Sequence, residues 1–335
     1  MSLIATAQRD LIATSMADFA AEHPDLRYLF FGGKGGVGKT VMAGVTAVHI
    51  ARSGKRVLLA STNPVHSLSG LLDQDVFGRH TPVDGVDGLW ALEIDTRQSI
   101  ERAKKDIKEK IEWFLQFAEI KTKAEEFVGA ATTNPAFEES AMFEKMTDLM
   151  FDDAYDVYVF DTAPTANARR LLGMSKVYAL WVNKMVKSRE EAQSLRELLS
   201  FTKKKQDDPL MTYLVEFQGR ITRARDLLTD ADRTAFFFVT LPESLPIAVI
   251  RRFIGWFTDI GIPVGGVVVH QVIEPGDLAT VPEFVRNRVE MQREHLAAIR
   301  DEFPGLVRAV LPLHDDEIRG PAALSATAAE LFGSA

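Results

Sequence analysis

The amino-acid sequence predicts an α/β fold, a doubly wound, mainly parallel sheet with a helical subdomain inserted into it. Short apolar runs alternate with longer stretches of helical pattern along the chain. The apolar runs are nearly continuous and rich in β-branched and aromatic residues, as strands buried on both faces are. Two of the helical stretches are longer than a crossover between parallel strands needs. Together these three observations favour a layered α/β domain over an all-helical or all-β one.

The expected elements follow the chain in order. Apolar residues recur at helical spacing from Leu3 to Phe19, which predicts one amphipathic helix ending near Pro24. The long stretches, 96–150 and 166–233, are rich in Lys, Glu, Leu and Ala and poor in Gly, so we expect both to be helical. We place them together as a subdomain at one end of the sheet, within a single domain that covers residues 1–335. Strands are predicted at 27–31, 56–61, 89–94, 156–161, 235–240, 264–272 and 307–313.

Composition excludes several classes of function. The 335 residues carry a net charge of −8, which argues against nucleic acid as a partner. There is no cysteine, so disulfides, thiolate metal sites and cysteine nucleophiles are excluded. No apolar run reaches the roughly 18 residues of a membrane span, and Arg9, Asp10 and Asp18 interrupt the N-terminal apolar stretch. We therefore expect a cytoplasmic protein that reaches a membrane only peripherally, through a partner.

One segment indicates nucleotide chemistry. FFGGKGGVGKT, residues 30–40, fits G-x-x-x-x-G-K-[ST] and lies between a predicted strand and a predicted helix. In such a loop Lys39 reaches the β- and γ-phosphates, the Thr40 hydroxyl binds Mg²⁺, and the helix N-terminus faces the same anion. We therefore predict a P-loop NTPase that binds ATP and Mg²⁺. Its glycines let backbone N–H groups converge on phosphate oxygens, and the candidates are Gly33, Lys34, Gly35, Gly36, Val37 and Gly38.

A second lysine, Lys34, makes this the deviant form of the loop. It resembles the loop of the deviant phosphate-loop ATPases, a group that includes nitrogenase iron protein and the septum-site ATPases. In that group the lysine crosses a homodimer interface and contacts the partner's phosphates. The resemblance thus implies a homodimer in which Lys34 acts catalytically in trans, adding positive charge where charge shifts during phosphoryl transfer. The alternative is a lysine that only decorates the loop.

Three further segments narrow the resemblance. They are STNPVHSLS at 61–69, YDVYVFDTAPTANARRLL at 155–172 and LPLHDDEIRG at 311–320. These are similar to motifs of the arsenite-pump ATPase family ArsA and its relatives, the cytosolic ATPases that target tail-anchored membrane proteins. The similarity runs from about Leu26 to Phe332, and the combination is more specific than the phosphate loop alone.

The resemblance also implies roles for single residues. Asp161 would be the carboxylate near Mg²⁺, with 61–69 as the first switch and 162–167 as the second. His270 and Gln271 stand where the family commonly has Asn-Gln, with the Asn reading adenine. The loop 312–317, which begins with Pro312 and Leu313, would close over the base. Simpler interpretations stay open, because Asp161 could cap a strand end and His270 could be a satisfied core histidine.

The sequence departs from the family pattern in three places. Asn63 stands at the position of the catalytic aspartate, and an amide can hydrogen-bond but cannot take a proton. Asn63 is either natural or an engineered trap for ATP, and the intact remainder of the site favours the trap. Pro282 and Val285 stand at about the positions of the C-x-x-C pair that binds zinc across some family dimers, so we expect no zinc. A thiolate site for arsenite is likewise excluded.

Three functions remain open at this stage. The leading one is a homodimeric ATPase chaperone, in which ATP closes the dimer and joins the two helical subdomains into a groove for a hydrophobic client helix. The alternatives are an ATPase subunit that energises a membrane pump for arsenite or another anion, and a nucleotide-gated switch with little hydrolysis. The chaperone hypothesis is motivated by large apolar residues of the two long stretches: Trp113, Phe114, Phe117, Phe127, Leu180, Trp181, Met185 and Met211. Aromatic residues and methionines at helical spacing more often belong to a core than to a binding groove.

Overall fold

The computed structural model describes residues 3–62, 67–95, 98, 100–102, 104–105, 108–109, 135–161, 187, 209–274 and 279–332. The chain divides into two compact units. The first contains Met1–Thr96, Asp148–Ala166 and Asp230–Ala335, and the second contains Arg97–Thr147 and Asn167–Thr229. Each unit is therefore described by itself below.

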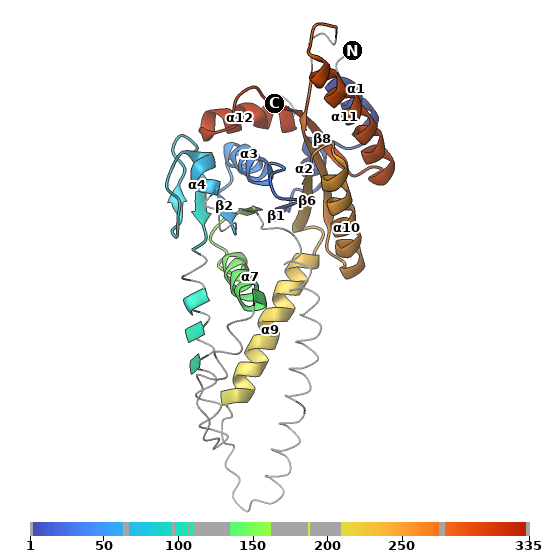
Figure 1. Cartoon of the computed structure of the whole chain (residues 1–335). Helices are drawn as coiled ribbons and strands as arrows, with labels where there is room; N and C mark the ends of the chain where they lie inside the picture. The colour runs from blue at the N-terminus through green and yellow to red at the C-terminus, as the bar shows by residue number, and fades with distance from the viewer. Residues whose placement is uncertain are drawn as a thin grey trace, which may run out of the picture. The chain divides into compact units, whose positions relative to one another are not determined.

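The described residues of the first unit form an eight-stranded sheet with the order β3-β4-β2-β5-β1-β6-β7-β8 (Figure 1). Neighbouring strands pair in parallel, except β3 with β4, which are antiparallel. The mainly parallel, doubly wound α/β prediction is thus confirmed. The strands are β1 (Tyr28–Gly32), β2 (Val57–Ser61), β3 (Thr81–Pro82), β4 (Leu89–Glu93), β5 (Val157–Asp161), β6 (Thr234–Thr240), β7 (Val264–Val272) and β8 (Val307–Pro312).

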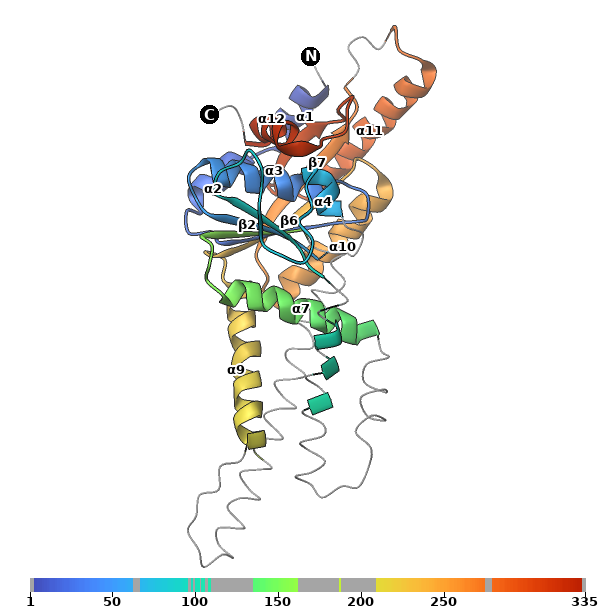
Figure 2. The same ribbon diagram turned by 90° about the vertical axis from the view of Figure 1, so that its left-hand side faces the viewer.

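Helices cover both faces of this sheet. Figures 1 and 2 show α3 and α12 over one face and α10 over the other. This follows from right-handed crossovers, because the chain runs from β1 towards one edge of the sheet and from β6 towards the other. The described helices are α1 (Leu3–Leu11), α2 (Met16–Glu22), α3 (Lys39–Arg52), α4 (Ser67–Leu72), α7 (Pro135–Phe151), α9 (Pro209–Thr229), α10 (Ser244–Ile260), α11 (Glu283–Glu302) and α12 (Gly320–Phe332).

The central strands of the sheet form the fully buried part of the core. Every residue of β1, β2, β5 and β6 is buried, as their continuous apolar sequences predict. Across three neighbouring strands the Phe30 ring stacks on Phe160 and Phe236, with ring centroids 4.8 and 4.3 Å apart. Aromatic stacking of this kind adds to the burial of the rings and holds the carboxyl ends of these strands in register.

The prediction of a single N-terminal helix is wrong. The chain forms two helices, α1 and α2, separated at Ile12–Ser15. The Ser15 hydroxyl accepts the Asp18 N–H at 3.1 Å, and the Asp18 carboxylate accepts the Ser15 N–H at 3.2 Å. This capping box satisfies the first backbone N–H groups of α2 and so starts a new helix where apolar spacing alone suggested continuity.

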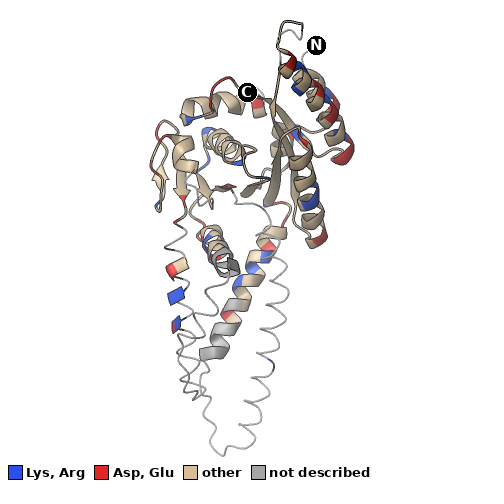
Figure 3. Ribbon diagram, in the orientation of Figure 1, with Lys and Arg blue, Asp and Glu red and all other residues tan. Residues whose placement is uncertain are grey.

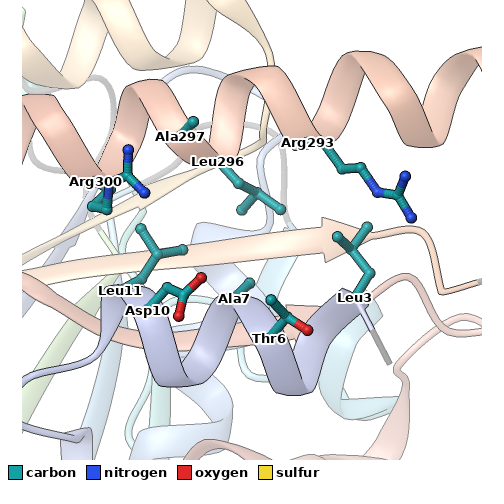
Figure 4. A pocket seen from close by; sticks show the side chains of 9 residues that line it. All are labelled: Leu3, Thr6, Ala7, Asp10, Leu11, Arg293, Leu296, Ala297 and Arg300. Carbon is teal, nitrogen blue, oxygen red and sulfur yellow. The ribbon is translucent and has the colours of Figure 1, made fainter. Parts of the chain in front are cut away.

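The first of these helices packs beside α11. Figure 4 shows Leu3, Ala7 and Leu11 of α1 turned towards Leu296 of α11, around a cavity of about 320 Å³. The Gln8 side chain donates to the Val310 carbonyl of β8 at 3.2 Å, so α1 is also tied to the edge strand of the sheet. Figure 3 shows basic and acidic residues interspersed along the ribbon of α11.

The second unit is helical in its described residues, which include α9 and most of α7. The insertion boundaries 96–150 and 166–233, and a client groove within them, stay predictions. No helix in the described parts of the chain has the length and hydropathy needed to cross a membrane. Most residues proposed for the groove lie outside the described residues: Trp113, Phe114, Phe117, Phe127, Leu180, Trp181 and Met185. Met211 lies in α9, but its side chain is not among those described.

Candidate nucleotide-binding site

The phosphate loop joins the end of β1 to the start of α3. Gly33, Gly36 and Gly38 have φ angles of 145°, 81° and 95°, a region that disfavours any side chain. A Cβ at Gly33 would lie 2.4 Å from the Val239 carbonyl oxygen, and one at Gly38 would lie 2.4 Å from His270 Nδ1. Backbone conformation therefore favours glycine at all three positions, and lack of space requires it at Gly33 and Gly38 as well. Gly38 is the N-cap of α3, so the unpaired N–H groups of that helix begin inside the loop.

The two lysines of the loop lie in different surroundings. Lys39 is buried, and its ammonium donates to the Lys34 carbonyl oxygen at 3.3 Å, across the loop. Burial lowers the pKa of Lys39, and the charge of Asp161 opposes that shift. The Lys34 side chain is half-buried and forms no ion pair within the described part of the chain. The Lys39 ammonium thus lies within the loop, whereas the Lys34 ammonium can contact a group outside the loop.

Asp161 ends β5 beside the loop and is fully buried. Its Oδ2 accepts the Thr40 hydroxyl at 2.7 Å and the Ser61 hydroxyl at 3.1 Å. Its Oδ1 is buried and has no hydrogen-bond partner among the described residues. Burial raises the pKa of Asp161, whereas the hydrogen bond from Thr40 and the charge of Lys39 act to lower it.

This arrangement fits Mg²⁺. The ion prefers hard oxygen ligands and retains several of its waters. Asp161 Oδ1 is such an oxygen, and burial without a partner is costly unless a cation or water compensates it. The Thr40 hydroxyl donates a hydrogen bond to Oδ2, the other oxygen of the same carboxylate. Thr40 and Asp161 are therefore suited to hold the ion, directly or through water, as the sequence pattern predicts.

The residues proposed for the base lie at the ends of β7 and β8. His270 is buried, and its Nδ1 lies 3.2 Å from the Val37 carbonyl oxygen, so it contacts the phosphate loop itself. Burial lowers the pKa of His270. Gln271 has a φ of 59°, and its carbonyl oxygen accepts Gln292 Nε2 at 3.1 Å. Pro312 ends β8 and Leu313 is 51% exposed beyond it. Adenine recognition by these residues stays a prediction.

Two parts of the predicted site lie outside the described residues. One is Asn63, within the segment 63–66, and the other is the second switch, 162–167. Ser61, the first residue of the predicted first switch, donates to Asp161. The structure adds one polar residue that sequence reasoning missed, Glu93, which is buried at the end of β4. A carboxylate within the otherwise apolar run 89–94 is the signal that could have identified it.

Comparison with known proteins decides the family. The family model of the anion-transporting ATPases, ArsA, matches residues 26–333, nearly the whole chain. This chain belongs to that family. The anion-transporting ATPase resemblance inferred from the motifs is therefore confirmed, and with it the assignment of the chain as an ATPase. Residues 1–25, which include α1 and α2, lie outside the match.

Several relatives are similar to this chain over most of their length. ATPase ASNA1 homolog 2 of Paramecium tetraurelia is 28% identical, covering 89% of this chain and 91% of the relative. ATPase GET3C of Arabidopsis thaliana is 32% identical, covering 89% of this chain and 80% of the relative. A putative arsenical pump-driving ATPase 2 of Aquifex aeolicus is 28% identical, covering 88% of this chain and 95% of the relative. All three relatives are thus named as ATPases, and the name of the Aquifex aeolicus relative refers to an arsenical pump.

Proposed function

We propose that this chain is a homodimeric, MgATP-dependent ATPase whose nucleotide state controls the binding of hydrophobic helices, such as those of tail-anchored membrane proteins. The observation that carries the proposal is the way the chain leaves the sheet. β4 ends at Glu93 and the second unit begins at Arg97, while β5 ends at Asp161 and the second unit resumes at Asn167. Both segments of the helical unit therefore start close in sequence to the carboxyl strand ends that carry the site.

The chain's own residues would divide the work as follows. Backbone N–H groups of the loop and the start of α3 bind the phosphates, and Lys39 places its positive charge against them. Thr40 and Asp161 hold Mg²⁺, which when bound neutralises phosphate charge. Asn63 can orient a water by hydrogen bonding but cannot remove its proton. A change in phosphate state would reach the second unit through 162–167, which connects Asp161 to that unit.

Lys34 gives a test of the dimer. Replacing Lys34 with alanine should leave nucleotide affinity of the monomer unchanged, because in our proposal its ammonium contacts the partner's phosphates. ATP-dependent dimerisation should weaken about tenfold, the loss of one charge-assisted hydrogen bond. Sedimentation velocity with ATP and with ADP measures dimerisation, and calorimetry measures affinity. Lys55→Ala, a surface lysine at the amino end of β2, is the control. Equal loss of affinity and dimerisation in Lys34→Ala would exclude a role in trans.

Client binding needs its own experiment. The full-length protein is incubated with a peptide that contains one transmembrane helix, with ATP or with ADP, and recovered by affinity capture. Capture should be stronger with ATP, because dimer closure assembles the groove. A peptide of equal length with two charges placed in the apolar segment is the control. If neither nucleotide gives capture above the charged control, the chaperone proposal is wrong.

The pump is the second candidate, and the name of the Aquifex aeolicus relative, an arsenical pump-driving ATPase, favours it. A thiolate site for arsenite cannot form in this chain, because it has no cysteine. A pump subunit would therefore have to recognise an anion through oxygen or nitrogen groups. Stimulation of ATP turnover by arsenite or antimonite would support this candidate over the chaperone.

A further inference from the structure

Three polar side chains end neighbouring strands beside the phosphate loop. In the register of the sheet, Ser61 of β2 is the partner of both Glu93 of β4 and Asp161 of β5. All three residues are buried. Ser61 and Asp161 contact each other, and Asp161 contacts the loop through Thr40. Glu93 is the member of this row to which neither the family motifs nor the roles proposed above assign a task.

Glu93 is bound to the first turn of α4. Its Oε1 accepts the Leu68 N–H at 3.0 Å, and its Oε2 accepts the Ser69 hydroxyl at 2.7 Å. The Glu93 backbone N–H donates to the Val76 carbonyl at 2.9 Å, and the Val76 N–H lies 3.3 Å from Ser69 Oγ. A carboxylate that is 1% exposed needs such donors, because an uncompensated buried charge is strongly unfavourable. The contacts therefore tie both ends of the α4 region to β4.

The same helix reaches the phosphate loop. α4 begins at Ser67, whose hydroxyl lies 3.4 Å from that of Thr40. Thr40 in turn donates to Asp161. The segment 63–66, which contains Asn63, joins the chain immediately before Ser67. The position of α4 therefore fixes Ser67, the first described residue after that segment.

We propose that Glu93 is a positioning residue for ATP hydrolysis. Its carboxylate holds the first turn of α4 so that Ser67 stays beside Thr40 and the segment 63–66 is anchored at its carboxyl end. Glu93 touches neither nucleotide nor metal in this scheme and acts through α4. The inference rests on the proposed role of 61–69 as the first switch.

The test uses the Asn63→Asp protein as its reference. Glu93→Gln and Ser69→Ala are each introduced into that protein and compared with it. Glu93→Gln keeps the shape and removes the charge, while Ser69→Ala removes one donor from the same carboxylate. The control is Glu302→Gln, which removes the charge of a glutamate in an ion pair with Arg251, on α11 and α10. Three quantities are measured: kcat and KM for ATP, affinities for ATP and ADP, and hydrogen exchange of the backbone amides of 67–72.

Glu93→Gln should lower kcat about tenfold, the loss of one charge-assisted hydrogen bond, while ADP affinity stays unchanged. Exchange at 67–72 should accelerate, and Ser69→Ala should give smaller changes in the same direction. The Glu302→Gln control should match the background. Unchanged kcat with unchanged exchange would overturn the proposal. A fall in kcat matched by equal falls in ADP affinity and unfolding temperature would also overturn it, because that result describes a merely structural residue.

The proposed ATP hydrolysis and the positioning role of Glu93 can fail independently, and the experiment distinguishes the two. If the Asn63→Asp background itself shows no turnover, the ratio of ATP to ADP affinity replaces kcat as the measure of how α4 responds to the γ-phosphate. Glu93→Gln should then reduce that ratio and accelerate exchange at 67–72. If both are unchanged in the variant, Glu93 has no positioning role.

Discussion

Replacing Asn63 with aspartate is expected to raise ATP turnover about 10²–10⁴-fold, the usual contribution of a positioned general base. The asparagine amide can hydrogen-bond a water but has no basic oxygen to take its proton. The other groups of the site, Lys39, Thr40 and Asp161, are already arranged around the loop. Single-turnover hydrolysis of MgATP, followed by phosphate release for the parent chain and for Asn63→Asp, measures the effect.

The control for this prediction is Asn63→Gln, which keeps an amide and should stay as slow as the parent. ATP affinity should be similar in all three proteins, because the aspartate acts on water rather than on binding. Equal turnover in the parent and in Asn63→Asp would contradict the assignment of position 63. If both were slow, the nucleotide-gated switch would become the better description of the protein.

Lys39→Ala is expected to remove tight MgATP binding. Truncating one partner of a buried charge pair costs about 2–5 kcal/mol, which corresponds to a weakening of roughly 30-fold to several thousandfold. Lys39 meets this condition because it is buried and lies across the loop at the start of α3. Calorimetric titration with MgATP measures the loss for the full-length protein.

Two controls accompany this measurement. Lys55→Ala removes an exposed lysine with a 3.5 Å contact to the Pro24 carbonyl, at the opposite end of β2, and should bind MgATP like the parent. Thermal unfolding without nucleotide checks that Lys39→Ala is folded, since the substitution removes the hydrogen bond from the Lys39 ammonium to the Lys34 carbonyl. Folded Lys39→Ala with parental affinity would show that the loop does not bind phosphate through this residue.

Local sequence was sufficient for the strands of the sheet's centre and for the loop. Strands buried on both faces have to be continuously apolar, and the apolar runs at 27–31, 56–61 and 156–161 coincide with β1, β2 and β5 to within one residue. The edge strand Thr81–Pro82 was missed because two residues carry no periodicity. The break between α1 and α2 was missed because apolar spacing continues through it, while the deciding signal is the Ser15–Asp18 capping box.

Which residues come together in the site depends on the order of the strands in the sheet. Residues far apart in the chain become neighbours only because β4, β2, β5 and β1 lie side by side, which places Glu93, Ser61 and Asp161 in one row beside the loop. His270 likewise meets Val37 because its strand, β7, ends near the phosphate loop. Motif and periodicity are properties of consecutive residues, so they predict the loop and its strand. Pairing between distant strands is set by packing of the whole sheet. It alone determines that Asp161 accepts the Thr40 hydroxyl, whereas Glu93 holds the first turn of α4.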